Sequence, residues 1–301
     1  MSVSPSSLLA ELLSFQPSLI HPLPGLPGAD VLRLDQIDPQ ISGNKVFKLS
    51  GHLQQAEQQG ARALLSFGGP YSNHLHALAA LGQRFGIATI GVVRGYEHLP
   101  LTPTLEDCQA MGMTLVFADK KTYSRRYQVD YQQQLATEYK AYVIGEGGQG
   151  ADGESGCGLL ADYCQRSEGL PYDEVWLAVG TGTTALGLAK ALYQQGSQCR
   201  VVGVNAVADQ GECFQRWQQA MPSANWQLFD QYHHGGFGKC PEVLRALIQR
   251  YDQQDLPLDP VYTAKLFWAY EQQLSLNPPL ATKRVLLVHS GGLQGRRGFN
   301  L

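Results

Sequence analysis

Apolar residues recur along this chain at two spacings, and the two spacings predict alternating strands and helices. Short apolar runs that end in glycine or a polar turn have the length of buried strands, whereas apolar residues repeated every three or four positions have the helical period. These patterns predict strands at 31–35, 63–67, 89–93, 114–117, 141–144, 174–179, 201–204 and 284–289, and helices at 45–59, 73–85 and 185–193. Strands that alternate with helices favour an α/β fold whose parallel sheets are covered by helices.

Glycine is more frequent than usual and is concentrated in one segment. The chain has 33 glycines in 301 residues, against a usual frequency of about 7%. Seven of them fall between positions 145 and 158. Such a density is typical of a flexible connection or a site loop rather than of a helix or strand. We therefore predict that the chain crosses from one domain to another near residue 150.

Length, charge and cysteine content exclude several classes of protein. A chain of 301 residues has room for one large domain or two ordinary ones. Its 23 basic and 26 acidic residues give a net charge of −3, without the basic clusters that bind nucleic acid. No apolar stretch reaches the ~18–20 residues that span a bilayer, and the six cysteines include no Cys-x-x-Cys pair. We expect a cytoplasmic protein with reduced, packed thiols, and neither nucleic acid nor a membrane as its partner.

A segment of glycines and threonines follows the strand predicted at 174–179. Residues 180–184 read Gly-Thr-Gly-Thr-Thr and open a predicted helix, so backbone N–H groups and hydroxyls can meet an anion at the positive end of that helix. The segment is not a P-loop, because no Gly-Lys-Ser/Thr follows. Nor is it the usual dinucleotide fingerprint, since Ala185 takes the place of the last glycine, although that place tolerates alanine. The segment predicts a phosphate cup, but on its own it fits a plain turn of small residues equally well.

A second glycine turn precedes the helix predicted at 73–85. Residues 66–74 read Ser-Phe-Gly-Gly-Pro-Tyr-Ser-Asn-His, which places Ser72, Asn73 and His74 at a helix N-terminus. The free N–H groups of a helix N-terminus favour a bound carboxylate. Ser72 is also a preferred N-cap residue. Capping the helix and binding a carboxylate are compatible roles.

Lys45 directly follows Asn44 at the start of the helix predicted at 45–59. The helix dipole makes this a poor place for a cation and a better one for a neutral imine. A lysine on a helix face is nevertheless most often a solvated charge. The same interpretation applies to Lys48.

Together these segments resemble the family of 1-aminocyclopropane-1-carboxylate (ACC) deaminase and D-cysteine desulfhydrase, which uses pyridoxal phosphate. Residues 42–49, Ser-Gly-Asn-Lys-Val-Phe-Lys-Leu, are similar to the family's Gly-Gly-Asn-Lys-Thr-Arg-Lys-Leu stretch. Residues 66–74 are similar to its Ser-Ile-Gly-Gly-x-x-Ser-Asn turn. Four more similar blocks lie at 146–148, 181–184, 259–262 and 289–292. The six blocks occur in the family's order and extend over nearly the whole chain.

The resemblance implies a fold and a domain division. The family has the tryptophan-synthase-β-like architecture of fold-type-II enzymes, with two α/β domains and the cofactor between them. The larger, pyridoxal-phosphate-binding domain is expected to comprise residues 1–47 and 156–301, and the smaller α/β domain residues 48–155. A small amino-acid substrate and a homodimer are further expectations that the family carries.

The resemblance also implies which residues hold the cofactor. Lys45 would bind pyridoxal phosphate as a Schiff base and, once released, would act as the base at the substrate Cα. Asn73 would bond the 3-oxygen of the ring, and Thr263 would face the pyridine nitrogen. The cup that would bind the phosphate consists of Gly180, Thr181, Gly182, Thr183 and Thr184.

The substrate would be bound by residues of three further blocks. Ser72, Asn73 and His74 would receive the substrate carboxylate. Phe237 and Tyr262 would contact the rest of the substrate. Ser72 and Tyr262 are rivals for proton transfer on the face opposite Lys45.

Departures from the family pattern bear on the substrate. Deaminases typically have Tyr-Glu where this chain has Tyr262-Thr263, and desulfhydrase-like members have Tyr-Thr. A hydroxyl leaves the pyridine nitrogen less protonated than a carboxylate would, which is adequate when a good leaving group such as thiolate assists. Ser290 resembles the threonine of the desulfhydrases' His-Thr-Gly-Gly block. The resemblance therefore favours β-elimination from D-cysteine to pyruvate, ammonia and sulfide, with deamination of ACC to 2-oxobutanoate and ammonia as the alternative. Phe237 stands where the family often has tyrosine, which leaves other small D-amino acids open as substrates.

Other classes of function fit only parts of the sequence. A non-catalytic amino-acid-binding protein would keep the cleft without the chemistry, yet both Lys45 and the cup are present. An enzyme of phosphosugars or nucleotides would use the cup alone and leave the blocks around Lys45 and Ser72 unexplained. His233, His234 and Cys240 lack the spacing of a tetrahedral metal site, so no metal is predicted.

Overall fold

A computed structural model describes residues 9–26, 28–165, 171–221 and 225–301. The chain divides into two compact units. The larger unit consists of Ser14–Asp38, Ser42–Asn44 and Cys157–Leu301. The smaller unit consists of Pro39–Ile41, Lys45–Gly156 and the described residues up to Leu13.

The larger unit is built on a six-stranded sheet with the order β1-β2-β10-β7-β8-β9. Its strands are β1 (Ile20–Pro22), β2 (Ala29–Arg33), β7 (Glu174–Val179), β8 (Arg200–Asn205), β9 (Trp226–Phe229) and β10 (Val285–His289). The short edge strand β1 is antiparallel to β2, and every other pair is parallel. The parallel sheet of an α/β fold that the sequence predicts is confirmed, with one antiparallel edge that the proline-rich start of the chain did not reveal.

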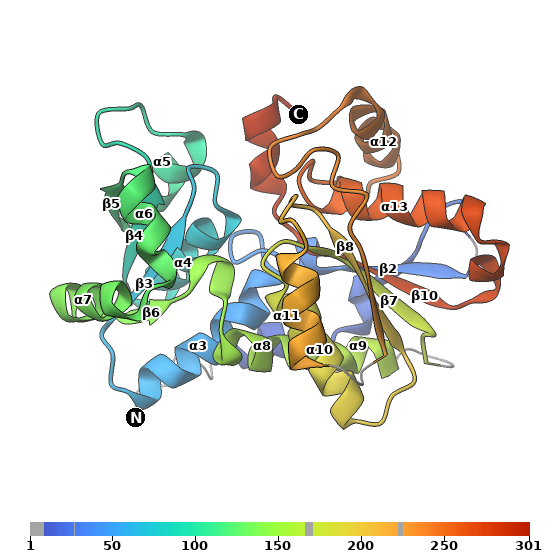
Figure 1. The fold of residues 1–301 in the computed structure, drawn as a ribbon, viewed down its shortest axis with the longest axis horizontal. Coiled ribbons are helices and arrows are strands. Elements are labelled where there is room, and N and C mark those ends of the chain that lie inside the picture. The colour runs from blue at the N-terminus through green and yellow to red at the C-terminus, as the bar shows by residue number, and fades with distance from the viewer. Residues whose placement is uncertain (1–8, 27, 166–170, 222–224) are drawn as a thin grey trace. The chain divides into compact units, whose positions relative to one another are not determined.

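Helices cover both faces of this sheet. They are α9 (Ala161–Gln165), α10 (Thr183–Gln194), α11 (Glu212–Ala220), α12 (Glu242–Asp252) and α13 (Thr263–Leu276). Figure 1 shows α13 along one face of the sheet and α10 on the other, as expected when right-handed crossovers connect parallel strands.

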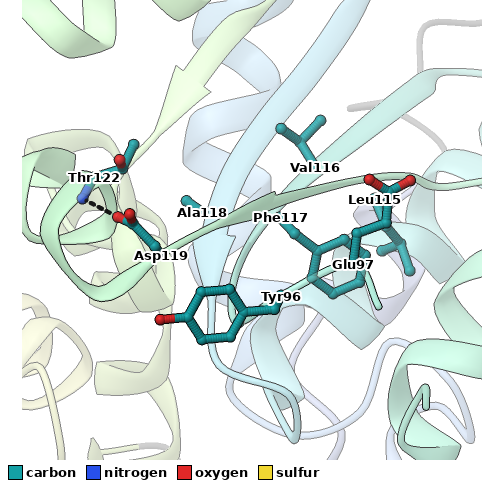
Figure 2. Close-up of a pocket in the computed structure, with 9 residues that line it drawn as sticks. Tyr96, Glu97, Leu115, Val116, Phe117, Ala118, Asp119 and Thr122 are labelled. Carbon is teal, nitrogen blue, oxygen red and sulfur yellow. Dashed lines mark hydrogen bonds between the residues drawn. The ribbon is translucent and has the colours of Figure 1, made fainter. Parts of the chain in front are cut away.

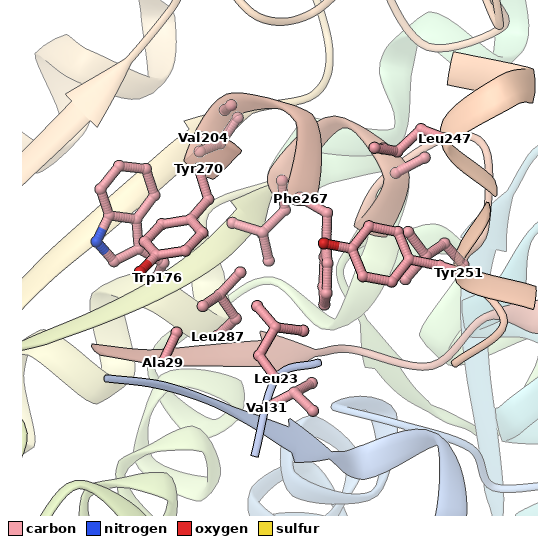
Figure 3. Close-up of a cluster of buried hydrophobic side chains, with 14 of the residues drawn as sticks. Leu23, Ala29, Val31, Trp176, Val204, Leu247, Tyr251, Phe267, Tyr270 and Leu287 are labelled. Atoms are coloured by element: carbon pink, nitrogen blue, oxygen red, sulfur yellow. The ribbon is translucent and has the colours of Figure 1, made fainter. Parts of the chain in front are cut away.

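A large apolar core lies between the sheet and helices α12 and α13. Trp176 of β7 packs edge-on against Tyr270 of α13, with ring centroids 5.3 Å apart, and Tyr251 of α12 packs against Phe267 at 5.1 Å. Figure 3 shows these rings facing aliphatic side chains of the strands, such as Leu287. Because the strands are buried on both faces, they consist of nearly continuous apolar residues, which is why the sequence signalled them clearly.

The smaller unit has a four-stranded sheet, all parallel, with the order β5-β4-β3-β6. Its strands are β3 (Ala63–Gly68), β4 (Ala88–Arg94), β5 (Thr114–Ala118) and β6 (Tyr142–Ile144). Its helices are α2 (Ala10–Leu13), α3 (Lys45–Gln58), α4 (Asn73–Phe85), α5 (Pro103–Ala110), α6 (Lys120–Ser124), α7 (Val129–Tyr139) and α8 (Ala151–Cys157, whose last residue groups with the larger unit). Phe67 of β3 packs against Tyr123 and Tyr131 in the core of this unit.

The prediction of an irregular connection over 145–158 is wrong for its second half. Residues 151–157 form α8, and 146–148 form a single 3-10 turn. The glycines of α8 allow its backbone to contact other backbone: a Cβ on Gly156 would lie 2.0 Å from the Phe47 carbonyl oxygen, and a Cβ on Gly153 would lie 2.2 Å from that of Gly148. These glycines therefore serve close packing against α3 and the preceding turn.

Two boundaries also differ from those inferred from the sequence. The strand predicted at 31–35 runs from Ala29 to Arg33, because Leu34–Gln36 turn into a 3-10 helix in which the Arg33 guanidinium bonds the Asp35 carboxylate at 2.7 Å. The described residues before Ser14 group with the smaller unit, as do residues 39–41, 45–47 and 156, whereas the division at 47 and 156 assigns all of them to the larger one.

In the described part of the chain, no helix is both long enough and apolar enough to cross a bilayer. All six cysteines are free thiols, and all but Cys240 are buried.

Candidate active site

The phosphate cup predicted at 180–184 forms the junction between β7 and α10. Gly182 is the N-cap of α10 and has φ of +81°, a conformation that glycine adopts without strain. It supplies no side-chain acceptor, so the first N–H groups of α10 keep their hydrogen-bonding capacity for a ligand. The hydroxyls of Thr181 and Thr183 lie 3.1 Å apart and are hydrogen-bonded to each other. The turn therefore combines helix N–H groups with hydroxyls, as an anion site requires.

Asn44 joins the cup from a distant part of the chain. Its side-chain amide donates a 2.8 Å hydrogen bond to the hydroxyl of Thr184, and both residues are buried. Its backbone N–H donates to the carbonyl of Ser290 at 3.1 Å. Asn44 is not among the site residues that the sequence predicts, although its place directly before Lys45, in a block that resembles the family's, is the signal that identifies it.

Asp259 organises the turn that carries Tyr262 and Thr263. Its carboxylate accepts hydrogen bonds from the backbone N–H groups of Val261, Tyr262 and Thr263, at 2.8–2.9 Å. The Thr263 hydroxyl donates to Asp259 Oδ2 at 2.7 Å and accepts the Asp259 N–H at 2.6 Å. Thr263 is thus fully buried and held at the N-terminus of α13.

Tyr262 and Phe237 lie next to the cup. A Cβ on Gly180 would come within 2.9 Å of the Tyr262 ring, so only glycine lets the turn approach this tyrosine. Phe237 packs edge-on against Tyr262 with ring centroids 6.1 Å apart, and half of its surface is exposed. The Lys265 ammonium donates to the carbonyls of Ala206 and Gly236 at 2.7 and 2.8 Å, which holds the segment before Phe237. Burial lowers the pKa of Lys265 to about 8, although Asp259 opposes the shift.

His289 is a fully buried structural residue at the end of β10. Its Nε2 donates to the Pro257 carbonyl at 2.7 Å, and its Nδ1 lies 3.2 Å from Asp35 Oδ1 and accepts from the Gly291 N–H at 3.3 Å. It therefore fixes the glycine turn that follows Ser290.

In the smaller unit, Lys45 is the first residue of α3 and Lys48 lies one turn later. Lys45 is partly exposed, whereas Lys48 is buried and its Nζ donates to the Gly147 carbonyl at 2.9 Å. The expectation that Lys48 is an ordinary solvated lysine is therefore wrong. It ties the 146–148 turn to α3.

The same turn is held by Glu146, which belongs to another block that is similar to the family's. Its carboxylate accepts from the hydroxyls of Tyr123 and Tyr127 and from the Arg126 guanidinium, at 2.6–2.8 Å. Burial raises the pKa of the Glu146 carboxyl, but these hydrogen bonds outweigh it and hold the pKa below its usual range. Glu146 is therefore a charged structural anchor.

Ser72 caps α4, as the sequence predicts. Its hydroxyl accepts the Leu75 N–H at 3.2 Å. The N–H groups of Asn73 and His74 lie in the first turn, where a helix offers them no acceptor. The Oδ1 atom of Asn73 is buried and has no hydrogen-bond partner in the described part of the chain.

His74 can serve a carboxylate through its backbone but not through its ring. The Ser66 hydroxyl donates to the Ile144 carbonyl at 2.9 Å, so at 2.9 Å from His74 Nε2 it must accept the ring N–H. Nδ1 is then an acceptor, and it is buried without a partner among the described residues. Burial, and next the charges of Lys45 and Lys48, lower the pKa of His74 well below its usual value. The neutral ring therefore has no free N–H for an anion.

An open pocket of about 570 Å³ lies elsewhere on the smaller unit, at the ends of β4 and β5. Figure 2 shows Tyr96, Glu97 and Asp119 along its wall. None of the predicted site residues lines it. In the described ranges, no group of three or more His, Cys, Asp or Glu side chains could hold a metal ion, and His233, His234 and Cys240 form no such group.

A family model described as "Pyridoxal-phosphate dependent enzyme" matches residues 16–291. The chain belongs to this family of pyridoxal-phosphate dependent enzymes. Pyridoxal phosphate is accordingly its cofactor.

Curated relatives of this pyridoxal-phosphate dependent enzyme carry two kinds of name. A "Putative 1-aminocyclopropane-1-carboxylate deaminase" of Pyrococcus horikoshii is 29% identical over 289 residues, which is 89% of this chain and 86% of that protein. A "D-cysteine desulfhydrase" of Serratia proteamaculans is 28% identical over 287 residues, 87% of this chain and 86% of that protein. A crystal structure of an "ACC deaminase homologue" has a TM-score of 0.82 at 24% identity and covers 100% of this chain and 98% of its own. That likeness confirms the fold-type-II architecture.

Three features of the pyridoxal-phosphate dependent enzyme fit this cofactor. The cup offers hydroxyls and helix N–H groups of the kind that hold a phosphate. The buried Asn73 amide has an oxygen without a partner in the described part of the chain, which a polar group of the cofactor can satisfy. Lys45, the first residue of α3, has a primary amine of the kind that can bind an aldehyde covalently.

Proposed function

We propose that this enzyme eliminates the β-substituent of a small D-amino acid, with D-cysteine as the leading candidate. One water would be consumed, and the products would be pyruvate, ammonia and hydrogen sulfide. The observation that most supports this proposal is Thr263, a hydroxyl residue directly after Tyr262, at the position where ACC deaminases have glutamate. Position 263 therefore has no carboxylate to offer the pyridine nitrogen, and the Thr263 hydroxyl is hydrogen-bonded to Asp259. A weakly protonated pyridine nitrogen is a poor electron sink, which favours reactions in which thiolate leaves easily.

The larger unit is proposed to bind the cofactor. Thr181, Thr183 and Thr184, with the N–H groups of the cup, would hold its phosphate. Tyr262 and Phe237 would form a wall of the cofactor site next to Gly180. The contact of Tyr262 with Gly180, and of Phe237 with Tyr262, supports this role. The hydroxyl of Tyr262 would be one of two candidates for giving a proton to the departing thiolate.

The smaller unit is proposed to bind the substrate and to move the proton at Cα. Bound pyridoxal phosphate supplies the electron sink for the charge that develops there. The Lys45 amine, freed when the substrate amine takes its place, would accept the Cα proton at Nζ. The N–H groups of Asn73 and His74, with the Ser72 hydroxyl, would hold the substrate carboxylate, and Asn73 would also contact the cofactor ring. The Ser72 hydroxyl is the second candidate for protonating the leaving group.

The test is a substrate comparison on the purified protein with pyridoxal phosphate. We expect sulfide and pyruvate from D-cysteine, less from L-cysteine, and little 2-oxobutanoate from ACC. Lys45→Ala should lower the rate of sulfide release about 10³-fold or more, because it removes both the covalent attachment and the base. It should also change the visible absorption of the bound cofactor. A colourless parent protein that stays colourless with pyridoxal phosphate would overturn the proposal.

Ring opening of ACC is the second candidate, favoured by the relative at 29% identity that carries the deaminase name. Faster turnover of ACC than of D-cysteine would replace the first proposal with this one. Thr263→Glu sharpens the choice, because a carboxylate near the pyridine nitrogen keeps it protonated. If the first proposal is right, this variant should gain ACC turnover relative to D-cysteine turnover.

A further inference from the structure

Helix α11 is placed next to the phosphate cup by the order of the strands. Strands β7 and β8 are parallel neighbours, with Val179 opposite Asn205, so the segments that follow them emerge side by side. β7 leads into the cup. After β8, the Asn205 amide donates to Asp209 Oδ1 at 2.8 Å, and Asp209 Oδ2 accepts the Cys213 N–H at 2.9 Å, which anchors the start of α11. One side of α11 therefore faces the turn at Gly182.

Two donors on α11 converge on that turn. The Arg216 guanidinium donates to the carbonyl oxygen of Thr181. A Cβ on Gly182 would lie 2.6 Å from Arg216 Nη2 and 2.9 Å from Trp217 Nε1. Trp217 is 1% exposed, and its indole N–H has no acceptor among the described residues. The turn is thus contacted by the cation of Arg216, an exposed residue, and by a buried donor, and only glycine fits at position 182.

The contact with Thr181 bears on ligand binding because of peptide geometry. In a trans peptide the carbonyl of one residue and the N–H of the next point in opposite directions. A donor that fixes the Thr181 carbonyl on the α11 side therefore directs the Gly182 N–H to the other side. The positive φ of Gly182 then starts α10, whose first N–H groups have no intrahelical acceptor.

We propose that Arg216 is a positioning residue for the cofactor phosphate: it holds the Thr181–Gly182 peptide so that the cup presents its N–H groups to the phosphate dianion. The inference rests on the proposed role of the cup as the phosphate site. Arg216 acts from behind the turn and does not itself contact the substrate. Its charge adds to the positive potential of the α10 N-terminus. No local pattern in the sequence marks this arginine, which lies 35 residues after Thr181.

The experiment compares two ligands that differ only in the phosphate. Full-length protein freed of cofactor is titrated with pyridoxal phosphate and with pyridoxal, and Kd is read from the visible absorption. Arg216→Ala should raise Kd for pyridoxal phosphate about tenfold, the usual effect of losing a hydrogen bond from a charged group, and should change Kd for pyridoxal less than about twofold. Arg216→Lys should fall between parent and Arg216→Ala, because it keeps the charge but not the planar fork. Gln215→Ala, an exposed neighbour on α11, is the matched control and should equal the parent.

The possible results of the titration distinguish failure of this inference from failure of the proposed phosphate site. An unchanged Kd for pyridoxal phosphate in Arg216→Ala would overturn the positioning role while leaving the cup intact as a phosphate site. Equal weakening of both ligands would overturn it too, because that result indicates a general structural defect. A parent protein that binds pyridoxal as tightly as pyridoxal phosphate would instead refute the cup as the phosphate site, and the inference would fall with it.

Discussion

The two glycine turns use one local motif in different ways. Each follows a parallel strand and opens a helix: β7 leads into α10 and β3 leads into α4. In the larger unit the N-cap is Gly182, which offers no side-chain acceptor to the first turn of α10. In the smaller unit the N-cap is Ser72, whose hydroxyl accepts the Leu75 N–H. One helix leaves its donors for a ligand, and the other already satisfies one of them.

Under the proposed function, this difference matches what each turn would bind. The α10 turn adds three threonine hydroxyls and the Arg216 contact to its N–H groups, as befits a dianionic phosphate that remains bound between turnovers. The α4 turn offers two first-turn N–H groups and one hydroxyl, as befits a single carboxylate that exchanges in every turnover. Under the proposed function, damage to the first turn should weaken cofactor binding, and damage to the second should slow the reaction.

The sharpest way to break this division is Ser72→Ala. Loss of a hydroxyl that binds the substrate carboxylate and is a candidate proton donor should lower kcat/KM for D-cysteine about 100-fold, with Kd for pyridoxal phosphate unchanged. The variant also loses an N-cap, which costs about 1 kcal/mol of stability. Asp119→Ala is the control for that cost, because Asp119 caps α6 by accepting the Thr122 N–H. The Asp119→Ala variant should lose about as much stability as Ser72→Ala and keep the full activity of the parent. A rise in the cofactor Kd of Ser72→Ala would contradict the division.

Thr184→Val examines the other turn with a smaller expected effect. The substitution keeps the side-chain shape but removes the hydroxyl that accepts the Asn44 amide at 2.8 Å. We expect Kd for pyridoxal phosphate to rise about tenfold, since the buried hydrogen bond that joins the cup to Asn44 is lost. At saturating cofactor, kcat should stay within about twofold of the parent.

A control for Thr184→Val exists in the smaller unit. Thr104 is fully buried, and its hydroxyl has no partner in the described part of the chain. Thr104→Val should therefore be neutral or slightly stabilising and should leave the cofactor Kd unchanged. If Thr184→Val bound the cofactor as tightly as Thr104→Val does, the Thr184 hydroxyl would have no part in the phosphate site.

The local sequence sufficed to predict an element where the residues that begin and end it are part of the local pattern. The helix predicted at 73–85 is observed over those residues, because Ser72 caps it and Gly86, with φ of +67°, ends it. Eight strands were predicted to within about two residues because they are mostly apolar, whereas the short edge strands β1 and β9 of the larger unit were not predicted. The cup was found because its residues are contiguous.

Features that depend on distant contacts could not be found in this way. The glycines of α8 resemble a loop until their contacts with Phe47 and Gly148 are known. Lys48 has the appearance of a solvated charge, yet it is buried against Gly147, which lies 99 residues later. The tautomer of His74 depends on Ser66 and Ile144, which the pairing of β3 with β6 brings together, and its lowered pKa depends on burial in the folded unit. Contacts between segments distant in the sequence, rather than residue type, decide each of these.

Stability as a function of pH extends the comparison of the two units. Each contains a buried basic group whose pKa is lowered: His74 in the smaller unit and Lys265 in the larger. A group with a lowered pKa binds fewer protons in the folded than in the unfolded chain, so the free energy of unfolding rises with pH between the two values. For His74 this means a loss of stability as pH falls below about 6.5. For Lys265 it means a gain as pH rises from about 8 toward 10.5.

Lys265→Met separates the two slopes and carries the smallest expected effect. Between pH 7 and 9 the methionine variant should gain about 1 kcal/mol less than the parent, since Lys265 loses its proton in the folded chain while remaining charged in the unfolded one. The buried thiols of Cys164, Cys213 and Cys240, whose raised pKa values oppose this gain, act equally in both proteins, and the acid-side loss should be kept. Denaturant titrations across this range measure both slopes, with Lys239→Met as the exposed control in the same unit. If Lys265→Met gained as much stability at alkaline pH as the parent, another group would be responsible for the gain. The hydrogen bonds from the Lys265 ammonium to the Ala206 and Gly236 carbonyls would then stabilise its charged form by at least as much as burial destabilises it.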